Sequence, residues 1–102
     1  MTPDKFIKAI PMACIVIGTD ERLRALNPAA EAMFGTAVVG RHFAAVLRQP
    51  ALLDRIEGAL SSRKPARSRY VYTREARERT YDVTITPLEE APGLILAFDD
   101  VT

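Results

Sequence analysis

The sequence has few residues of the types that build cross-links and metal sites: one cysteine, one histidine and no tryptophan among 102 residues. A single cysteine excludes an internal disulfide, and these two residues cannot form a metal site that needs several cysteine or histidine ligands. With no disulfide required, a reducing cytoplasm is permitted. The 14 basic and 13 acidic residues nearly balance, so the net charge of +1 provides no global attraction to nucleic acid or to a membrane surface.

Long hydrophobic runs are also missing. None approaches the roughly 20 residues of a transmembrane helix. Asp4, Lys5 and Lys8 interrupt the N-terminal segment, where a signal peptide would need an apolar stretch. The length suits one domain, and 48% of the residues are apolar, which is enough for one buried core. We therefore expect a single domain over residues 1–102 that makes no direct contact with a membrane.

Recognisable catalytic motifs are absent from the sequence. It contains no phosphate-binding glycine loop, dinucleotide fingerprint, phosphoacceptor-histidine segment or ATP-binding segment. Cys14 lies in an apolar run that disfavours a thiolate, so we expect a small buried side chain there. His42, beside Phe43, is expected at the surface or in a hydrogen bond, although haem needs only one axial histidine and stays an alternative role. A small hydrolytic enzyme is a rival interpretation, but no convincing site supports it, and we expect this chain by itself to be no enzyme.

Apolar periodicity and turn-forming residues predict a mixed order of helices and strands. Asn27 and Pro28 start one helix, because Asn is a favoured N-cap and Pro is favoured at the first helical position. Pro50 starts the longest helix in the same way. The predicted elements are a short N-terminal helix ending before residue 11, strands 13–17 and 23–26, a helix over 28–34, a helical turn over 44–48, a helix over 50–61, and strands 67–73, 80–86 and 94–98.

The segment from Arg63 to Arg79 holds seven basic residues and two acidic ones. Within it, residues 74–78 are expected to form a charged turn between two strands. A basic hairpin could attract nucleic acid, but no aromatic–glycine RNA-binding signature accompanies it. We interpret the charges as a solvated sheet edge that prevents association with other sheets.

The order of these features resembles a PAS domain over nearly the whole chain. The resemblance is carried by Gly18-Thr19-Asp20 after the first strand, Leu26-Asn27-Pro28-Ala29-Ala30 and Phe34-Gly35 around the short helix, and the terminal Asp100-Val101-Thr102. The last of these is similar to the D-x-T motif at which many PAS domains hand over to the next module. Segments 40–43 and 47–53 resemble those of phosphate-regulon-type sensor histidine kinases.

The resemblance implies an α+β PAS fold, with a five-stranded antiparallel sheet, short helices on one face and an N-terminal flanking helix. The flanking helix would occupy residues 1–11, and the core would occupy residues 12–102. The implied function is regulatory, sensory and dimerising, in a bacterial two-component histidine kinase that relays a signal to a C-terminal kinase module. Such a domain would be cytoplasmic, in a parent protein for which membrane anchoring stays an alternative, and nucleic acid is not an expected partner.

Residue roles follow from the same resemblance. Asp100 and Thr102 would fix the angle at which a following helix departs, although the neighbouring Asp99 leaves open which acid makes the contact. The candidate lining of a cleft between sheet and helices is Val16, Met33, Phe34, Leu47, Leu53, Ile56, Tyr70, Tyr81 and Val83. The candidate homodimer interface is Phe6, Ile7, Ile10, Ile15, Ile17, Ile95 and Ala97.

An apolar cleft suits a small apolar or aromatic ligand, and equally a core that its own side chains fill. We expect the filled core and no cofactor. The alternative is a sensor that binds haem, a non-covalent flavin or another small ligand. Covalent flavin attachment is not expected, because the Asn-Cys-Arg-Phe-type segment of photoreceptor PAS domains is missing.

Overall fold

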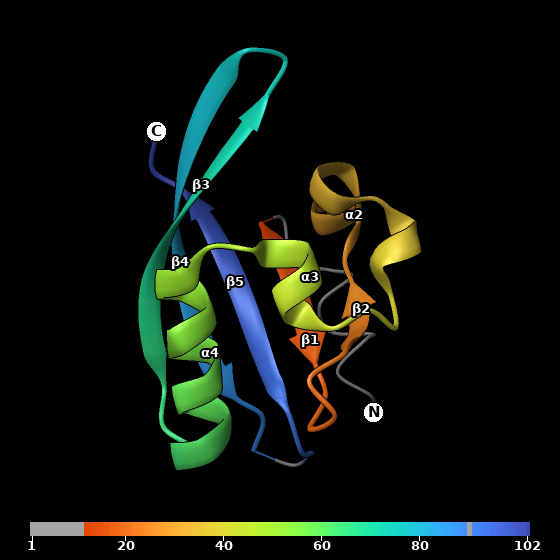
Figure 1. Cartoon of the computed structure of the whole chain (residues 1–102), viewed down its shortest axis with the longest axis vertical. Helices are drawn as coiled ribbons and strands as arrows, with labels where there is room; N and C mark the ends of the chain where they lie inside the picture. Colours follow the sequence, from red (N-terminus) through yellow and green to blue (C-terminus); the bar gives the residue numbers. More distant parts are fainter. Residues whose placement is uncertain (1–11, 90) are drawn as a thin grey trace.

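A computed structural model describes residues 12–89 and 91–102, which form a five-stranded antiparallel sheet covered on one face by helices (Figure 1). The strand order is β2-β1-β5-β4-β3. The predicted N-terminal helix lies outside the described residues. The elements are β1 (Ala13–Ile17), β2 (Leu23–Leu26), α2 (Pro28–Phe34), the 3₁₀ helix η1 (Thr36–Val38), α3 (Phe43–Leu47), α4 (Pro50–Ser62), β3 (Ala66–Arg74), β4 (Arg77–Pro87) and β5 (Leu94–Asp100).

The start of α2 follows the predicted capping pattern, and Asn27 also does more than cap the helix. Its Oδ1 accepts the Ala30 N–H at 3.0 Å, as an N-cap should. The same oxygen accepts the Cys14 N–H at 2.9 Å, and Nδ2 donates to the Met12 carbonyl at 2.6 Å. Asn27 is fully buried. Its side chain therefore fastens the start of α2 to the start of β1.

The cross-strand register decides which face of β1 is inside. Residues opposite each other in an antiparallel pair share a face, and Ile15 lies opposite Leu96 while Val16 lies opposite Ile95. Ile15, Ile17 and Leu96 are fully buried in the core under the helices, whereas Val16 and Ile95 belong to a small cluster on the outer face. The assignments of Ile15 and Ile17 to an outer interface, and of Val16 to the cleft, are therefore wrong. Because β1 is apolar on both faces, its own sequence could not distinguish them.

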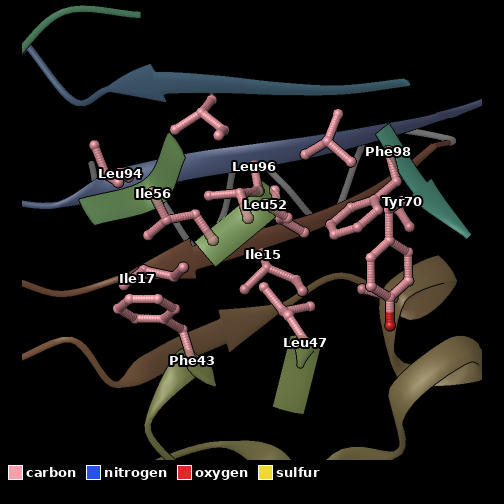
Figure 2. Packing of buried hydrophobic residues seen from close by; sticks show 14 of the residues in the cluster. Ile15, Ile17, Phe43, Leu47, Leu52, Ile56, Tyr70, Leu94, Leu96 and Phe98 are labelled. Carbon is pink, nitrogen blue, oxygen red and sulfur yellow. The ribbon is translucent and has the colours of Figure 1, made fainter. Parts of the chain in front are cut away.

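The space between sheet and helices is packed with large side chains. In Figure 2, Leu52 and Ile56 of α4, and Phe43 and Leu47 of α3, lie among residues of the sheet such as Ile15. The exposed fraction of each of these five side chains is 1% or less. Each buried aliphatic or aromatic side chain of this size stabilises the fold by roughly 1.5–3 kcal/mol. The helical face of the sheet is thus a filled core at this place.

The β3–β4 hairpin is longer than the sequence indicated. Its strands pair from Ala66 opposite Ile85 up to Arg74 opposite Arg77, and only two residues, 75 and 76, form the turn. Both turn residues have positive φ, 54° and 63°, as a type I′ turn requires. The predicted charged turn over residues 74–78 is therefore wrong at its ends. Glu75 and Ala76 lack the Asn-Gly signature of such turns, and Figure 1 shows this hairpin projecting past the rest of the sheet.

The turn before β5 packs tightly against β1. Gly93 has a φ of +112°, and a Cβ added there would lie 2.3 Å from the Ile17 carbonyl oxygen. Arg63, the C-cap of α4, donates from Nη1 to the Gly93 carbonyl at 2.9 Å and from Nη2 to the Leu88 carbonyl at 2.8 Å. These contacts join the end of α4 to the turn. They need glycine at position 93, because other residues rarely adopt this φ.

Candidate functional site

The end of β5 is held to β4 by a compact set of hydrogen bonds. Thr102 Oγ1 accepts the Thr80 N–H at 2.9 Å, and the Thr102 N–H donates to Asp100 Oδ1 at 3.0 Å. The Val101 N–H donates to the Thr80 carbonyl at 2.9 Å. Arg79 Nη1 lies 2.9 Å from Asp100 Oδ2. The exit of the chain from the sheet is therefore fixed by both residues of the predicted D-x-T motif.

The contacts identify the acid that acts at this exit. Asp100 makes the contacts with Thr102 and Arg79, which answers the choice between it and Asp99 that the sequence left open. Hydrogen bonds with Thr102, first its side chain and then its backbone N–H, lower the pKa of Asp100, and Arg79 adds a smaller effect. The carboxylate is thus held in its charged form, in which it accepts these bonds.

The predicted cleft residues fall into three groups in the structure. Buried members of the main core are Leu47, Ile56, Tyr70, Tyr81 and Val83. Met33, Phe34 and Leu53 are partly buried and pack against that core. Val16 lies in the outer cluster. The first two groups pack in and against the main core, and their role as the lining of a ligand cleft stays a prediction, whereas Val16 is on the opposite face of the sheet.

Of the two candidate reactive side chains, Cys14 is buried and His42 is held in hydrogen bonds. Cys14 is 1% exposed in the outer cluster, and burial raises the pKa of its thiol. His42 caps α3, because its Nδ1 accepts the Ala44 N–H at 3.1 Å, and its Nε2 lies 2.9 Å from Glu21 Oε1. Its ring also stacks on Phe43, with 4.7 Å between centroids. With both ring nitrogens in hydrogen bonds, iron ligation by His42 would require breaking one of them.

The outer face of the sheet carries the smaller apolar cluster. Cys14 and Val16 form its buried centre, and partly buried residues of neighbouring strands and turns pack around them, among them Ile95 and Ala97. These last two are the predicted interface residues that do lie on this face. Phe6, Ile7 and Ile10, predicted for the same interface, lie outside the described residues.

A hollow lies at the edge of the packed core, between α2 and the projecting hairpin. Its volume is about 820 Å³, and we call it the hairpin hollow. It is lined by Ala32, Met33, Tyr72, Glu75, Arg77, Arg79 and Tyr81. Arg79 therefore borders this hollow and also contacts the exit at Asp100.

Other kinds of site are not found in the described part of the chain. Residues 12–89 and 91–102 contain no group of three or more histidine, cysteine or acidic side chains placed to hold a metal ion. No helix within the same ranges has the length and hydropathy needed to cross a bilayer.

Comparison with known proteins agrees with this architecture. A family profile described as the PAS fold matches residues 7–102. The chain belongs to the PAS family. PAS domains of this kind are sensory domains and not catalytic ones. No curated protein sequence matches the chain.

Solved PAS structures superimpose on nearly the whole domain. The PAS domain of nitrogen regulation protein NR(II) from Vibrio parahaemolyticus is 17% identical, with a TM-score of 0.72 over 99% of both chains. The PAS domain of BvgS from Bordetella pertussis is 23% identical, with a TM-score of 0.74 over 97% of this chain and 83% of the other. The photoactive yellow protein domain of the sensor histidine kinase Ppr from Rhodospirillum centenum is 15% identical, with a TM-score of 0.77 over 95% and 92%. At these identities the likeness shows the shared fold.

Sequence reasoning missed two residues that hold the exit of this PAS domain. Thr80 was predicted only as the first residue of the strand over 80–86, and Arg79 only as part of a basic edge. Arg79 precedes Thr80 in β4, and Tyr81 lies opposite Asp100 in β5. A strand register would have revealed both contacts, since it places the start of β4 beside the end of β5.

Proposed function

We propose that this PAS domain is the regulatory and dimerising domain of a bacterial two-component sensor histidine kinase, and that it relays a signal to a kinase module through β5. The observation that carries the proposal is the fastening of Asp100 and Thr102 to β4 at 2.9 Å each, together with the 3.0 Å bond between the two residues. A fixed exit sets the direction of whatever follows the sheet. A change in that direction can bias a downstream element between two states.

The relay can be tested in a chimera that joins residues 1–102 to the kinase module of a two-component sensor lacking its own PAS domain. Thr102→Ala should change autophosphorylation by about fivefold or more, since coupling free energies are typically about 1–3 kcal/mol. Thr36→Ala, at an exposed position of η1 on the helical side, should leave the rate unchanged. Equal rates for wild type and Thr102→Ala, in chimeras that fold normally, would contradict the relay.

We also propose that the domain forms a homodimer through its N-terminal segment and the outer sheet face. The support is the apolar centre of that face at Cys14 and Val16, with Ile95 and Ala97 beside it. Burying such apolar area stabilises an association by about 25 cal/mol per Å² before ordering costs. β1 and β5 both contribute to this face, so a shift at the interface would reach the exit strand directly.

The dimer can be tested by light scattering during size-exclusion chromatography. Phe6→Asp combined with Ile7→Asp should give a folded monomer, because charge would replace the apolar stripe predicted there. Val39→Asp combined with Ala51→Asp is the matched control, since both positions are exposed on the helical side. A dimer that persists in the first double variant would contradict the proposed interface.

The alternative function is a sensor that binds haem, flavin or an apolar metabolite in the core. The packing of Leu52, Ile56 and Ile15 leaves this proposal less supported than the relay, because such a ligand would have to displace buried side chains. Native mass spectrometry separates the two proposals. Bare chains favour the relay, whereas extra mass lost on denaturation favours the sensor.

The proposed context completes the assignment. The domain would act in the cytoplasm, with the kinase module of its own polypeptide as partner. Membrane anchoring of the parent protein stays an open alternative. The phosphate-regulon subfamily is proposed only from the resemblance of segments 40–43 and 47–53. Co-expression with candidate response regulators, followed by phosphotransfer assays on the chimera, would test that subfamily.

A further inference from the structure

The side chains of the hairpin hollow change from aromatic to cationic along one face of the hairpin. Tyr81, Arg79 and Arg77 alternate along β4 and so point to the same face of the sheet. Tyr81 is 8% exposed, whereas the two arginines are exposed. Tyr72 lies opposite Arg79 and adds a second ring to this face. The hollow therefore has an aromatic floor and a cationic mouth.

Contacts within the domain hold the Tyr72 ring of this aromatic floor in place. The Tyr72 hydroxyl donates to the Met33 carbonyl at 2.7 Å, which links β3 to α2 across the hollow. Phe34 packs on the Tyr72 ring with 6.1 Å between centroids. A ring fixed in this way offers a flat apolar surface without rearrangement of the side chain. Pre-formed surfaces of this kind suit flat ligands.

The charges at the mouth decide what kind of ligand fits. Arg79 is paired with Asp100 at 2.9 Å. Arg77 has no ion pair among the described residues, and Glu75 is the acidic member of the lining. Within the described lining of the hollow, one cation is thus available and one acid stands nearby, so this lining favours a single carboxylate over a polyanion. A guanidinium binds a carboxylate through two parallel hydrogen bonds.

We propose that the hairpin hollow binds a small aromatic carboxylate, with its ring against Met33 and the tyrosines and its carboxylate on Arg77. The ligand also competes with Asp100 for Arg79. Arg79 adjoins Thr80, whose N–H bonds Thr102, so occupancy loosens the exit of β5. This consequence at the exit rests on the relay proposed above, whereas the binding itself rests on the hollow alone. The site borders the packed core, and it shares Met33 and Tyr81 with the predicted cleft lining.

The proposal can be tested by NMR titration of the uniformly ¹⁵N-labelled chain at constant ionic strength, with benzoate as the probe and benzamide as its neutral match. Benzoate should shift the Arg77 Nε signal and the Ala32 and Tyr72 amides in a saturable way. Benzamide should bind at least about tenfold more weakly than benzoate, because it lacks the charge that Arg77 recognises. Equal shifts with benzamide, equal shifts with inorganic phosphate, or no saturable shift with benzoate would each overturn the site.

Two variants make the test specific. Arg77→Gln should weaken benzoate binding about tenfold, while Arg67→Gln, on the outer face of the same hairpin, should leave it unchanged. Equal weakening by both variants would reduce the effect to general charge and overturn the proposal. In the wild type, the Thr102 amide should shift together with Arg77. A shift at Arg77 with a constant Thr102 amide would overturn the link to the exit, and the kinase chimera judges the relay separately.

Discussion

Replacing Asn27 with alanine should destabilise this PAS domain more than the loss of an ordinary helix cap. The substitution removes the acceptor for two buried N–H groups, those of Ala30 and Cys14, and the donor to the Met12 carbonyl. Neither buried N–H can turn to water in the packed fold, since Ala30 is 0% and Cys14 1% exposed. The perturbation therefore strikes the helix start and the first strand together.

The expected magnitude follows from the two separate losses. An N-cap side chain contributes about 1 kcal/mol. The unsatisfied N–H of Cys14 adds about 1–3 kcal/mol, because a buried donor loses its partner and gains no water. Asn27→Ala should therefore lower the free energy of unfolding by about 2–4 kcal/mol, out of the roughly 5–15 kcal/mol typical of a domain.

Urea unfolding followed by circular dichroism measures this change. The midpoint should fall while the dependence on urea stays constant, because the surface exposed on unfolding is the same. Asn27→Ser is the matched variant: it keeps a capping oxygen for Ala30 but is too short to reach Cys14 in addition. It should cost less than Asn27→Ala. A cost below about 1 kcal/mol for Asn27→Ala would refute the dual role of the side chain.

Three further predictions concern the exit of β5, the buried thiol of Cys14 and two glycines. The pKa of Asp100 is lowered in the fold, so its contacts are complete above the unfolded pKa of about 3.9 and are lost as the pH falls through the folded pKa. The NMR shift of the Thr102 amide should therefore stay constant down to about pH 4 and move below it. Movement of this signal near neutral pH would contradict the prediction. Cys14 should react with iodoacetamide at least about 100-fold more slowly in the native state than in urea, because burial raises its pKa and reaction needs local opening; equal rates would show that the thiol is accessible. Gly93→Ala should destabilise the domain by more than about 1 kcal/mol, because the added Cβ would strike a backbone carbonyl of β1. Gly58→Ala should stabilise α4 by about 0.5–1 kcal/mol, since nothing lies within 4 Å of its added Cβ. Thermal unfolding of both variants checks these opposite signs.

Features that depend on neighbouring residues could be predicted from the sequence. Asn27 and Pro28 indicated the start of α2 because capping involves residues a few positions apart. Apolar periodicity indicated the strand over 80–86, and its alternating apolar residues Tyr81, Val83 and Ile85 are all buried. In each case the signal lies within one element, so no knowledge of its partners was needed.

Features that depend on pairing between distant segments could not be predicted in this way. The inner face of β1 became clear only from the register of Ile15 with Leu96. The extension of the hairpin depended on two turn residues, Glu75 and Ala76, that carry no typical turn signal. The hairpin hollow and the role of Arg79 follow from that extension, so neither could have been found before it.

The pairing of β1 with β5 also has a consequence for how the domain is made. Ala13 lies opposite Phe98, and these central strands are separated by about 80 residues of chain. During synthesis, the core face of β1 must therefore wait for β5 before its buried isoleucines are covered from that side. A ribosome that pauses before Leu94 would hold a chain whose most apolar strand has an open edge, which is the state in which nascent domains need a chaperone.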